Sequence, residues 1–426
     1  MQMDGYNHLI DLNFDDCIGC TRCMRICPTE AIRIVNGKVK LLEEKCINCG
    51  SCFSTCHVHA FKVQGDRKEA LTQYRFNAVI LPIAIYGMIK ELDDLKIIYR
   101  TLYDLGFDAI FDSSIIYEWL GDKIEDYLCL NHENKPYILT HCPSIVKLIQ
   151  LKYPSLRDHL VPFDFPLEIG AKLIRKFYAK KLSLNFDEIG ISYMTECVAN
   201  YMAIKQPTGK EKSNVDLVFL LSNSLKTILE HIHSDDDEVF QPTGSVKGIL
   251  WAKVGGVRRM MNVIDCLSVD GMNQVVEILE KLELGQLDNI NVLEAYACVG
   301  GCVGGTFTLE NPFIAKSKIN RLVGMVACTY TDENQEFKKM LSDVDWVFEK
   351  ELEVFDISRL DDDFVASLIK LQSINDIYDH LPKIDCCACG SPSCRALAED
   401  IVLGLKQLSD CMVLAQSKRG GAFDGE

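Results

Sequence analysis

Residues 294–305 read EAYACVGGCVGG, which places two cysteines and four glycines in twelve positions. The stretch overlaps an apolar run, NVLEAYA at 291–297, that has the composition of a β-strand. Because glycine has no side chain, the backbone around Cys298 and Cys302 can lie close to a bound group. The sequence therefore predicts a strand that ends in a loop where two thiols hold a metal cluster against the chain.

Further strand-like runs precede this one and alternate with helical patterns. The runs are NAVILP (77–82), PYILTH (136–141), DEIGISYM (187–194) and VDLVFLL (215–221), and the helical patterns cover 88–105, 166–181 and 271–284. Such alternation predicts an α/β domain with largely parallel strands. Ligands of these folds collect where strands end, which is where several cysteines lie.

The overall composition is that of a globular protein of two or three units, with 426 residues, 48% apolar residues and a net charge of -16. The acidic balance argues against nucleic acid as a partner. No secretory signal is visible in the first residues, and the longest apolar run (78–89) is too short to span a membrane. We therefore expect a cytoplasmic protein without a membrane partner, in which sixteen of the 20 cysteines bind metal.

The N-terminal region, predicted as a domain at 1–70, contains two runs of C-x2-C-x2-C-x3-C. This spacing is typical of ferredoxins with two 4Fe-4S clusters, in which three cysteines of one run and the last cysteine of the other surround each cube. The alternative is a set of free or zinc-binding thiols. The predicted cluster ligands are Cys17, Cys20, Cys23, Cys27, Cys46, Cys49, Cys52 and Cys56.

The C-terminal region has a third motif at 381–415, with the spacing of a small four-cysteine iron-sulfur module. Its predicted ligands are Cys386, Cys389, Cys394 and Cys411. Cys387 is an alternative to Cys386, and we expect one helix between Cys394 and Cys411. The tail at 416–426 is rich in glycine and polar residues and is expected to be disordered.

The region between these domains, 71–380, contains four more candidates: Cys142, Cys197, Cys298 and Cys302. Taken alone, they could be buried core thiols. Their context resembles the FeFe hydrogenase family, through T-x-C-P at 140–143, C-x-A at 197–199 with a proline at 207, and E-x3-C-x-G-G-C-x-G-G at 294–305.

The resemblance implies an FeFe-hydrogenase-like two-lobed α/β catalytic domain between a ferredoxin-like α+β domain and a small iron-sulfur module. By this resemblance the four middle cysteines hold the H-cluster, a 4Fe-4S cube joined through Cys302 to a two-iron unit with carbon monoxide, cyanide and azadithiolate. Three further 4Fe-4S clusters would carry electrons. The implied partners are H2 and protons, a redox partner such as a ferredoxin or a signalling protein, and the FeFe-hydrogenase maturation proteins.

The ligands match the family, but their neighbours do not. Where catalytic members carry a relay cysteine, this chain has His141; where they carry a cyanide-binding lysine, it has Asn200. Glu196 replaces a proline, and Tyr296 replaces a methionine. His141 is predicted either to relay protons in place of the cysteine or only to fill space.

These changes suggest a divergent, slow hydrogenase of sensory type. The first alternative is an electron-transfer or iron-sulfur carrier protein that has this fold and no two-iron site. The second is a redox enzyme with another substrate.

Overall fold

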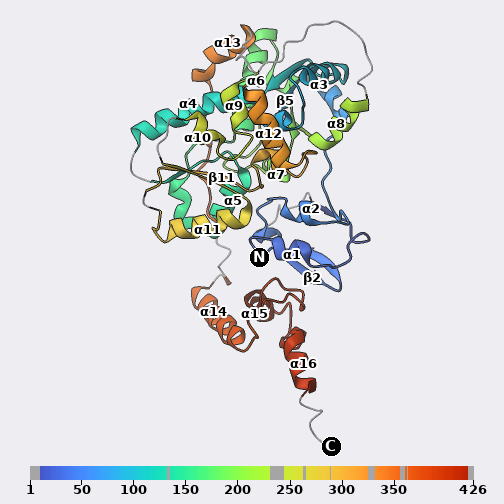
Figure 1. The fold of residues 1–426 in the computed structure, drawn as a ribbon, viewed down its shortest axis with the longest axis vertical. Helices are drawn as coiled ribbons and strands as arrows, with labels where there is room; N and C mark the ends of the chain where they lie inside the picture. The colour runs from blue at the N-terminus through green and yellow to red at the C-terminus, as the bar shows by residue number, and fades with distance from the viewer. Residues whose placement is uncertain are drawn as a thin grey trace, which may run out of the picture. The chain divides into compact units, whose positions relative to one another are not determined.

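The computed structural model describes residues 10–131, 135–230, 244–261, 265–287, 289–324, 332–355, 360–361 and 363–420. The chain forms two compact units (Figure 1). The terminal unit combines residues up to 47, 51–63 and those from 355 onward, and the middle unit comprises 48–50 and 64–354. The terminal unit therefore contains both ends of the chain.

The middle unit contains two parallel sheets. The larger has the order β6-β5-β8-β9, formed by β6 (Ala109–Asp112), β5 (Phe76–Leu81), β8 (Ile189–Thr195) and β9 (Leu217–Leu220). The smaller has the order β10-β11-β7, formed by β10 (Cys266–Asp270), β11 (Val292–Tyr296) and β7 (Tyr137–Ile138). Every residue of β8 is buried. Such continuous burial is expected for a central parallel strand covered on both faces.

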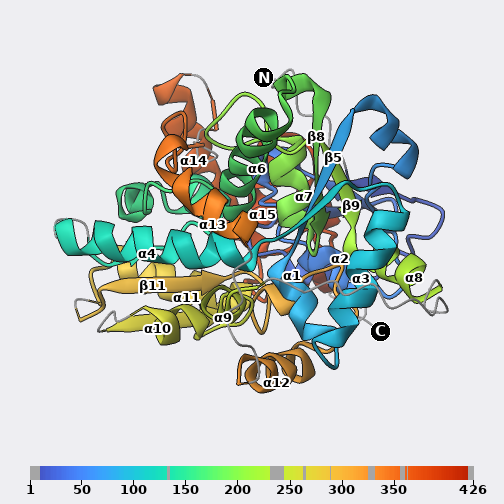
Figure 2. The ribbon, with the colours of Figure 1, turned by 90° about the horizontal axis from the view of Figure 1, so that it is seen from above.

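Helices cover both faces of the larger sheet. Figure 2 shows α6 on one side of β5 and β8, and α3 and α8 on the other. The helices of the middle unit are α3 (Asp93–Asp104), α4 (Ser114–Leu130), α5 (Pro143–Lys152), α6 (Pro166–Leu182), α7 (Val198–Lys205), α8 (Leu221–Glu230), α9 (Val246–Leu250), α10 (Gly256–Met260), α11 (Met272–Glu283), α12 (Pro312–Val323) and α13 (Asp332–Lys339). The expected α/β class with parallel strands is confirmed.

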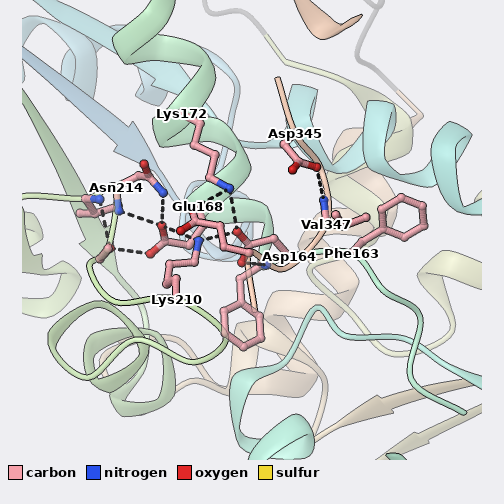
Figure 3. Close-up of polar contacts among 12 residues, drawn as sticks. Phe163, Asp164, Glu168, Lys172, Lys210, Asn214, Asp345 and Val347 are labelled. Carbon is pink, nitrogen blue, oxygen red and sulfur yellow. Dashed lines mark hydrogen bonds and ion pairs between the residues drawn. The ribbon is translucent and has the colours of Figure 1, made fainter. Parts of the chain in front are cut away.

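A buried ionic cluster lies at the start of α6 (Figure 3). The Lys210 ammonium pairs with Asp164 and, at 3.2 Å, with Glu168, and all three side chains are at most 1% exposed. Glu168 also accepts hydrogen bonds from Ser213 and Asn214. Buried charges are tolerated when they are paired in this way, so the cluster fixes the loop around Lys210 to α6.

The ferredoxin part of the terminal unit consists of two small antiparallel pairs and two short helices. β1 (Asp11–Leu12) pairs with β4 (Phe61–Lys62), and β2 (Ile32–Val35) pairs with β3 (Lys38–Leu41). The turn between β2 and β3 is Asn36-Gly37, and both residues have positive φ, as a two-residue hairpin loop requires. The helices are α1 (Arg22–Ile26) and α2 (Ser51–Thr55).

The C-terminal part of the terminal unit consists of α14 (Phe364–Asp379), α15 (Cys394–Val402) and α16 (Met412–Gly420). One α-helix, α15, lies between Cys394 and Cys411 as expected, but it ends at Val402 and does not reach Cys411. The Leu405 N–H donates to the Asp400 carbonyl, and Gly404 has φ +73°, which together form a helix-ending turn. The tail expected to be disordered from 416 is helical as far as Gly420, and 421–426 lie outside the described residues.

No helix in the described ranges has the length and apolar character needed to cross a membrane.

The buried ionic cluster generates a stability prediction. Lys210→Met should destabilise the middle unit by about 3–5 kcal/mol, because it leaves Glu168 buried without its ammonium partner and Asp164 with only the Lys172 ammonium, 3.4 Å away. Lys350→Met is the matched control: it breaks a pair with Glu211 whose side chains are 57% and 84% exposed, and it should cost less than about 1 kcal/mol. Denaturant unfolding of the two variants measures the difference, and equal losses would contradict the interpretation.

A second prediction concerns Asp112, a buried carboxyl at the end of β6 that accepts hydrogen bonds from the Tyr86 hydroxyl and the Ser114 N–H. Burial raises its pKa to about 6. A raised carboxyl pKa means that the folded protein holds the proton more tightly, so this contribution to stability is complete below about pH 4 and is lost as pH rises through 6. Asp112→Asn should remove about 3 kcal/mol of that pH dependence.

The measurement is unfolding of the parent and the variant between pH 4 and 7. Asp104→Asn, at the exposed end of α3, is the control and should follow the parent. An Asp112→Asn profile as steep as that of the parent would contradict the assignment.

Candidate metal centre

The four middle cysteines all follow the carboxyl ends of parallel strands. Cys142 follows β7 and is the N-cap of α5, which begins at Pro143. Cys197 follows β8 and is the N-cap of α7. Cys298 and Cys302 follow β11. The two sheets therefore contribute ligands at the edge where α/β folds bind their ligands.

The four thiols surround one site. Burial raises the pKa of each, and the charges of neighbouring groups raise it further. For Cys302 these neighbours are Glu196, Cys142 and Cys298; for Cys197 they include Cys298 and Cys302. Four crowded, desolvated thiols are poor places for negative charge unless cations lie among them. An iron cluster would supply that charge and replace the thiol protons.

Glycines make possible the close packing of the loop that follows β11, residues 297–305, which we call the third loop. Gly301 has φ +99°, and a Cβ there would lie 2.8 Å from the backbone of Lys253 and Val254. A Cβ on Gly304 would lie 2.1 Å from the Val299 carbonyl oxygen. Only a residue without a side chain fits at these positions, so the glycines are required by the path of the loop around its two thiols.

His141 lies against this site and has no hydrogen-bond partner among the described residues. Its ring is 5% exposed, packs 4.4 Å from the Tyr296 ring and 5.5 Å from the Trp251 ring, and leaves both nitrogens unpaired. Burial lowers its pKa to about 3, so the ring is neutral here. Orphaned buried nitrogens are rare, and a polar group bound beside Cys142 would give them a partner.

Asn200 and Glu196 interact with each other. The Asn200 amide donates to Glu196 at 3.0 Å, and the Tyr193 hydroxyl donates to the same carboxyl, also at 3.0 Å. Burial raises the pKa of Glu196 to about 7. The amide predicted to face a cyanide is therefore engaged by a neighbouring carboxyl in this structure.

Tyr296 is also engaged. Its hydroxyl donates to the Trp251 carbonyl at 2.9 Å and lies 3.2 Å from a Glu294 oxygen, while its ring contacts His141. Glu294 accepts a further hydrogen bond from the Val257 N–H. This carboxyl therefore joins β11 to α10, and Tyr296 forms one wall beside His141.

Two aromatic residues near the cysteines were missed from the sequence. Tyr117 lies on α4, where the charges of Cys302, Glu196 and Cys197 add to burial in raising its pKa. Tyr193 lies within β8 and contacts Glu196. Both belong to apolar runs that are typical of a buried core. Only the fold, which brings α4 and β8 beside the third loop, shows that these two residues lie near the cysteines.

In the ferredoxin part, Cys17, Cys20, Cys23 and Cys56 come together. The pKa of Cys23 is raised to about 11 by burial and by the charges of the other three. This set combines three cysteines of the first run with the last of the second, as the spacing predicts. Backbone N–H groups donate to Cys27 and Cys56 at 3.2 and 3.3 Å, which is typical around cluster sulfurs. The second set, with Cys46, Cys49 and Cys52, stays a prediction.

In the C-terminal part, the predicted cysteines line one cavity, together with Cys387. The Cys387 thiol donates to the Asp385 and Pro392 carbonyls at 3.3 and 3.1 Å. A thiolate ligand has no proton to donate, so this geometry favours Cys386 over Cys387 as the ligand. The other ligands around the cavity are Cys389, Cys394 and Cys411.

In the described ranges no three His, Cys, Asp or Glu side chains are placed to hold a single metal ion. A four-iron cube presents a different requirement, because its four thiolates sit at separate corners.

Comparison with known proteins matches three family models along the chain. Residues 78–262 match the iron only hydrogenase large subunit, C-terminal domain. Residues 9–57 match a 4Fe-4S dicluster domain, and 381–413 match an Fe-S cluster family. The hydrogenase match includes Cys142 and Cys197, and the glycine-rich loop lies beyond its end.

Solved structures of FeFe hydrogenases are similar over about two thirds of the chain. A variant of an FeFe hydrogenase from Chlamydomonas reinhardtii is 12% identical, with a TM-score of 0.48, over 68% of this chain and 97% of the other. An FeFe hydrogenase studied for oxygen inactivation of its H-cluster is 13% identical, with a TM-score of 0.45, over 67% and 97%. Along its length the chain is therefore similar, in this order, to a 4Fe-4S dicluster domain, to the C-terminal domain of the iron only hydrogenase large subunit and to an Fe-S cluster family.

Proposed function

We propose that this protein is a divergent FeFe hydrogenase that interconverts H2 with protons and electrons at a low rate and acts in hydrogen or redox sensing. The observation that carries the proposal is the convergence of Cys142, Cys197, Cys298 and Cys302 around one buried site. When bound, an H-cluster supplies heterolytic cleavage and formation of H2. The protein must bind the cluster, exclude water and move protons and electrons.

Binding would fall to the four thiols, and by the family resemblance Cys302 would be the residue that also holds the two-iron unit. The backbone N–H groups of Ser144, Ile145 and Ala297 interact with Cys142, and that of Asn200 donates to Cys197 at 3.5 Å. Such donors stabilise thiolates and tune the potential of a cluster. Electrons would pass through the three further 4Fe-4S clusters to a redox partner.

Proton movement would fall to His141. A neutral imidazole with both nitrogens unpaired can accept a proton at one and release it from the other. Glu196 is a second group that could hold a proton, although its oxygens are engaged by Tyr193 and Asn200.

An alternative function is electron transfer or iron-sulfur carriage without a two-iron unit. It is favoured by Asn200, which lacks the lysine charge that the family directs at cyanide and whose amide donates to Glu196. The cubes and their cysteines would be the same in both functions.

Infrared spectroscopy separates these functions. Protein matured with the FeFe-hydrogenase maturation proteins should show carbon monoxide and cyanide stretches. It should bind about eighteen irons, of which about sixteen belong to four 4Fe-4S cubes and about two to the two-iron unit. Protein produced without maturation should bind about sixteen. Matured protein that shows no such stretches and no additional iron would support the carrier function and contradict the hydrogenase.

His141→Ala should slow H2 turnover by roughly 10²–10⁴, the usual contribution of a positioned acid or base. It should leave the iron content unchanged and shift the infrared bands, because the group beside the ring loses its partner. His141→Cys, with the residue that the family has there, should retain more turnover than the alanine variant. Turnover of the alanine variant at the parent rate from pH 6 to 9 would mean that His141 only fills space.

A further inference from the structure

Within the terminal unit, the ferredoxin part contacts the C-terminal part. Arg33 on β2 donates from Nε to Asp400 on α15 at 2.7 Å, and the two side chains are only 4% and 3% exposed. Ser391 donates to the same carboxylate oxygen at 2.6 Å, and the Arg33 Nη1 donates to the Glu30 carbonyl. A buried pair with all these partners satisfied requires that the two segments dock in one defined arrangement.

Backbone contact reinforces the pair. The Ile34 N–H donates to the Gly390 carbonyl at 2.8 Å. Gly390 has φ +81°, and a Cβ there would lie 2.2 Å from the Ile34 carbonyl oxygen. A glycine is therefore required directly after Cys389 by the closeness of β2. At the edge of the contact, Lys45 pairs with Glu399 at 3.0 Å.

The docked segments are those that carry cysteines. Arg25 lies on α1 between Cys23 and Cys27, and its guanidinium donates to the Cys386 carbonyl at 3.4 Å. Gly390 and Ser391 follow Cys389 in the loop that lines the C-terminal cavity. The contact between the two ends therefore joins the wall of one predicted cluster site to the helix that carries ligands of the ferredoxin sites.

We infer that the C-terminal module is a built-in redox partner of the ferredoxin part, docked by Arg33 and Asp400, and that electrons pass between them within the chain at the Arg25–Cys386 contact. With cubes held by the C-terminal cysteines and by the ferredoxin cysteines, one electron would pass from the reduced cube to the oxidised one, and no bond or proton would change. The inference deepens the proposed electron path and depends only on the cubes. Arg25, Arg33 and Asp400 are positioning residues.

Full-length protein made without maturation and reduced with dithionite tests the docking, because it needs no two-iron unit. Pulsed electron paramagnetic resonance should show dipolar coupling between the C-terminal and ferredoxin cubes that disappears in Cys411→Ser. In Arg33→Met the coupling should be lost while the iron content is retained. Lys62→Met, which breaks an exposed pair with Asp16 in the same part, should keep the coupling.

A double variant, Arg33→Met with Asp400→Leu, guards against simple unfolding. Replacing both partners of a buried ion pair by apolar groups is often neutral, so the double variant should regain the coupling that Arg33→Met loses. Coupling that persists in Arg33→Met, or that is absent from the parent, would overturn the inference. Either result would leave the hydrogenase proposal to its own infrared test.

Arg25 is tested through the potential of the C-terminal cube. A reduced cube carries one more negative charge, which the nearby guanidinium favours, so Arg25→Gln should lower the potential and Arg25→Lys should largely keep it. Arg22→Gln, at an exposed position one turn earlier on the same helix, should have a smaller effect. Equal effects of the two glutamine variants would show that Arg25 does not act on this cube.

Discussion

Burial of four thiols at a single site is the constraint on which the middle unit depends. Each cysteine lies in a loop that follows a strand, and these strands belong to two separate sheets. Both sheets must therefore direct their carboxyl ends toward one place. Desolvation raises the pKa of every one of these thiols, which makes the site unfavourable for thiolates until cations neutralise them. The glycines of the third loop follow from the same constraint, since side chains there would collide with the backbone.

The residues around this site lack the positive charge that a lysine beside a cyanide ligand would provide. A lysine would bring a permanent positive charge, whereas Asn200 brings only an amide, and that amide donates to Glu196. The carboxyl adds negative charge when it ionises, near thiols whose pKa it already raises. Electrostatics around the four cysteines thus disfavour thiolates until a positively charged group is bound among them.

Much of this arrangement could be predicted from the sequence, because cysteine spacing and strand burial are local properties. The strand β8 and the helix α6 were predicted at nearly their observed positions. The short strands β6 and β10 were missed, since four or five mixed residues give no clear period. The partner of Asn200 could not be predicted either, because it depends on how α7 places the amide above Glu196.

The contact between the chain ends changes how the domain order should be understood. In sequence, a ferredoxin, a hydrogenase-like domain and a small module follow one another. In structure, the first and last form one unit, into which the middle unit is inserted. Closing so long a connection has an entropic cost that grows only slowly with length, so a buried ion pair and a few backbone contacts can hold the ends together. The Arg33–Asp400 pair can form only after the last module is synthesised, so the terminal unit cannot be complete before the whole middle unit has been translated.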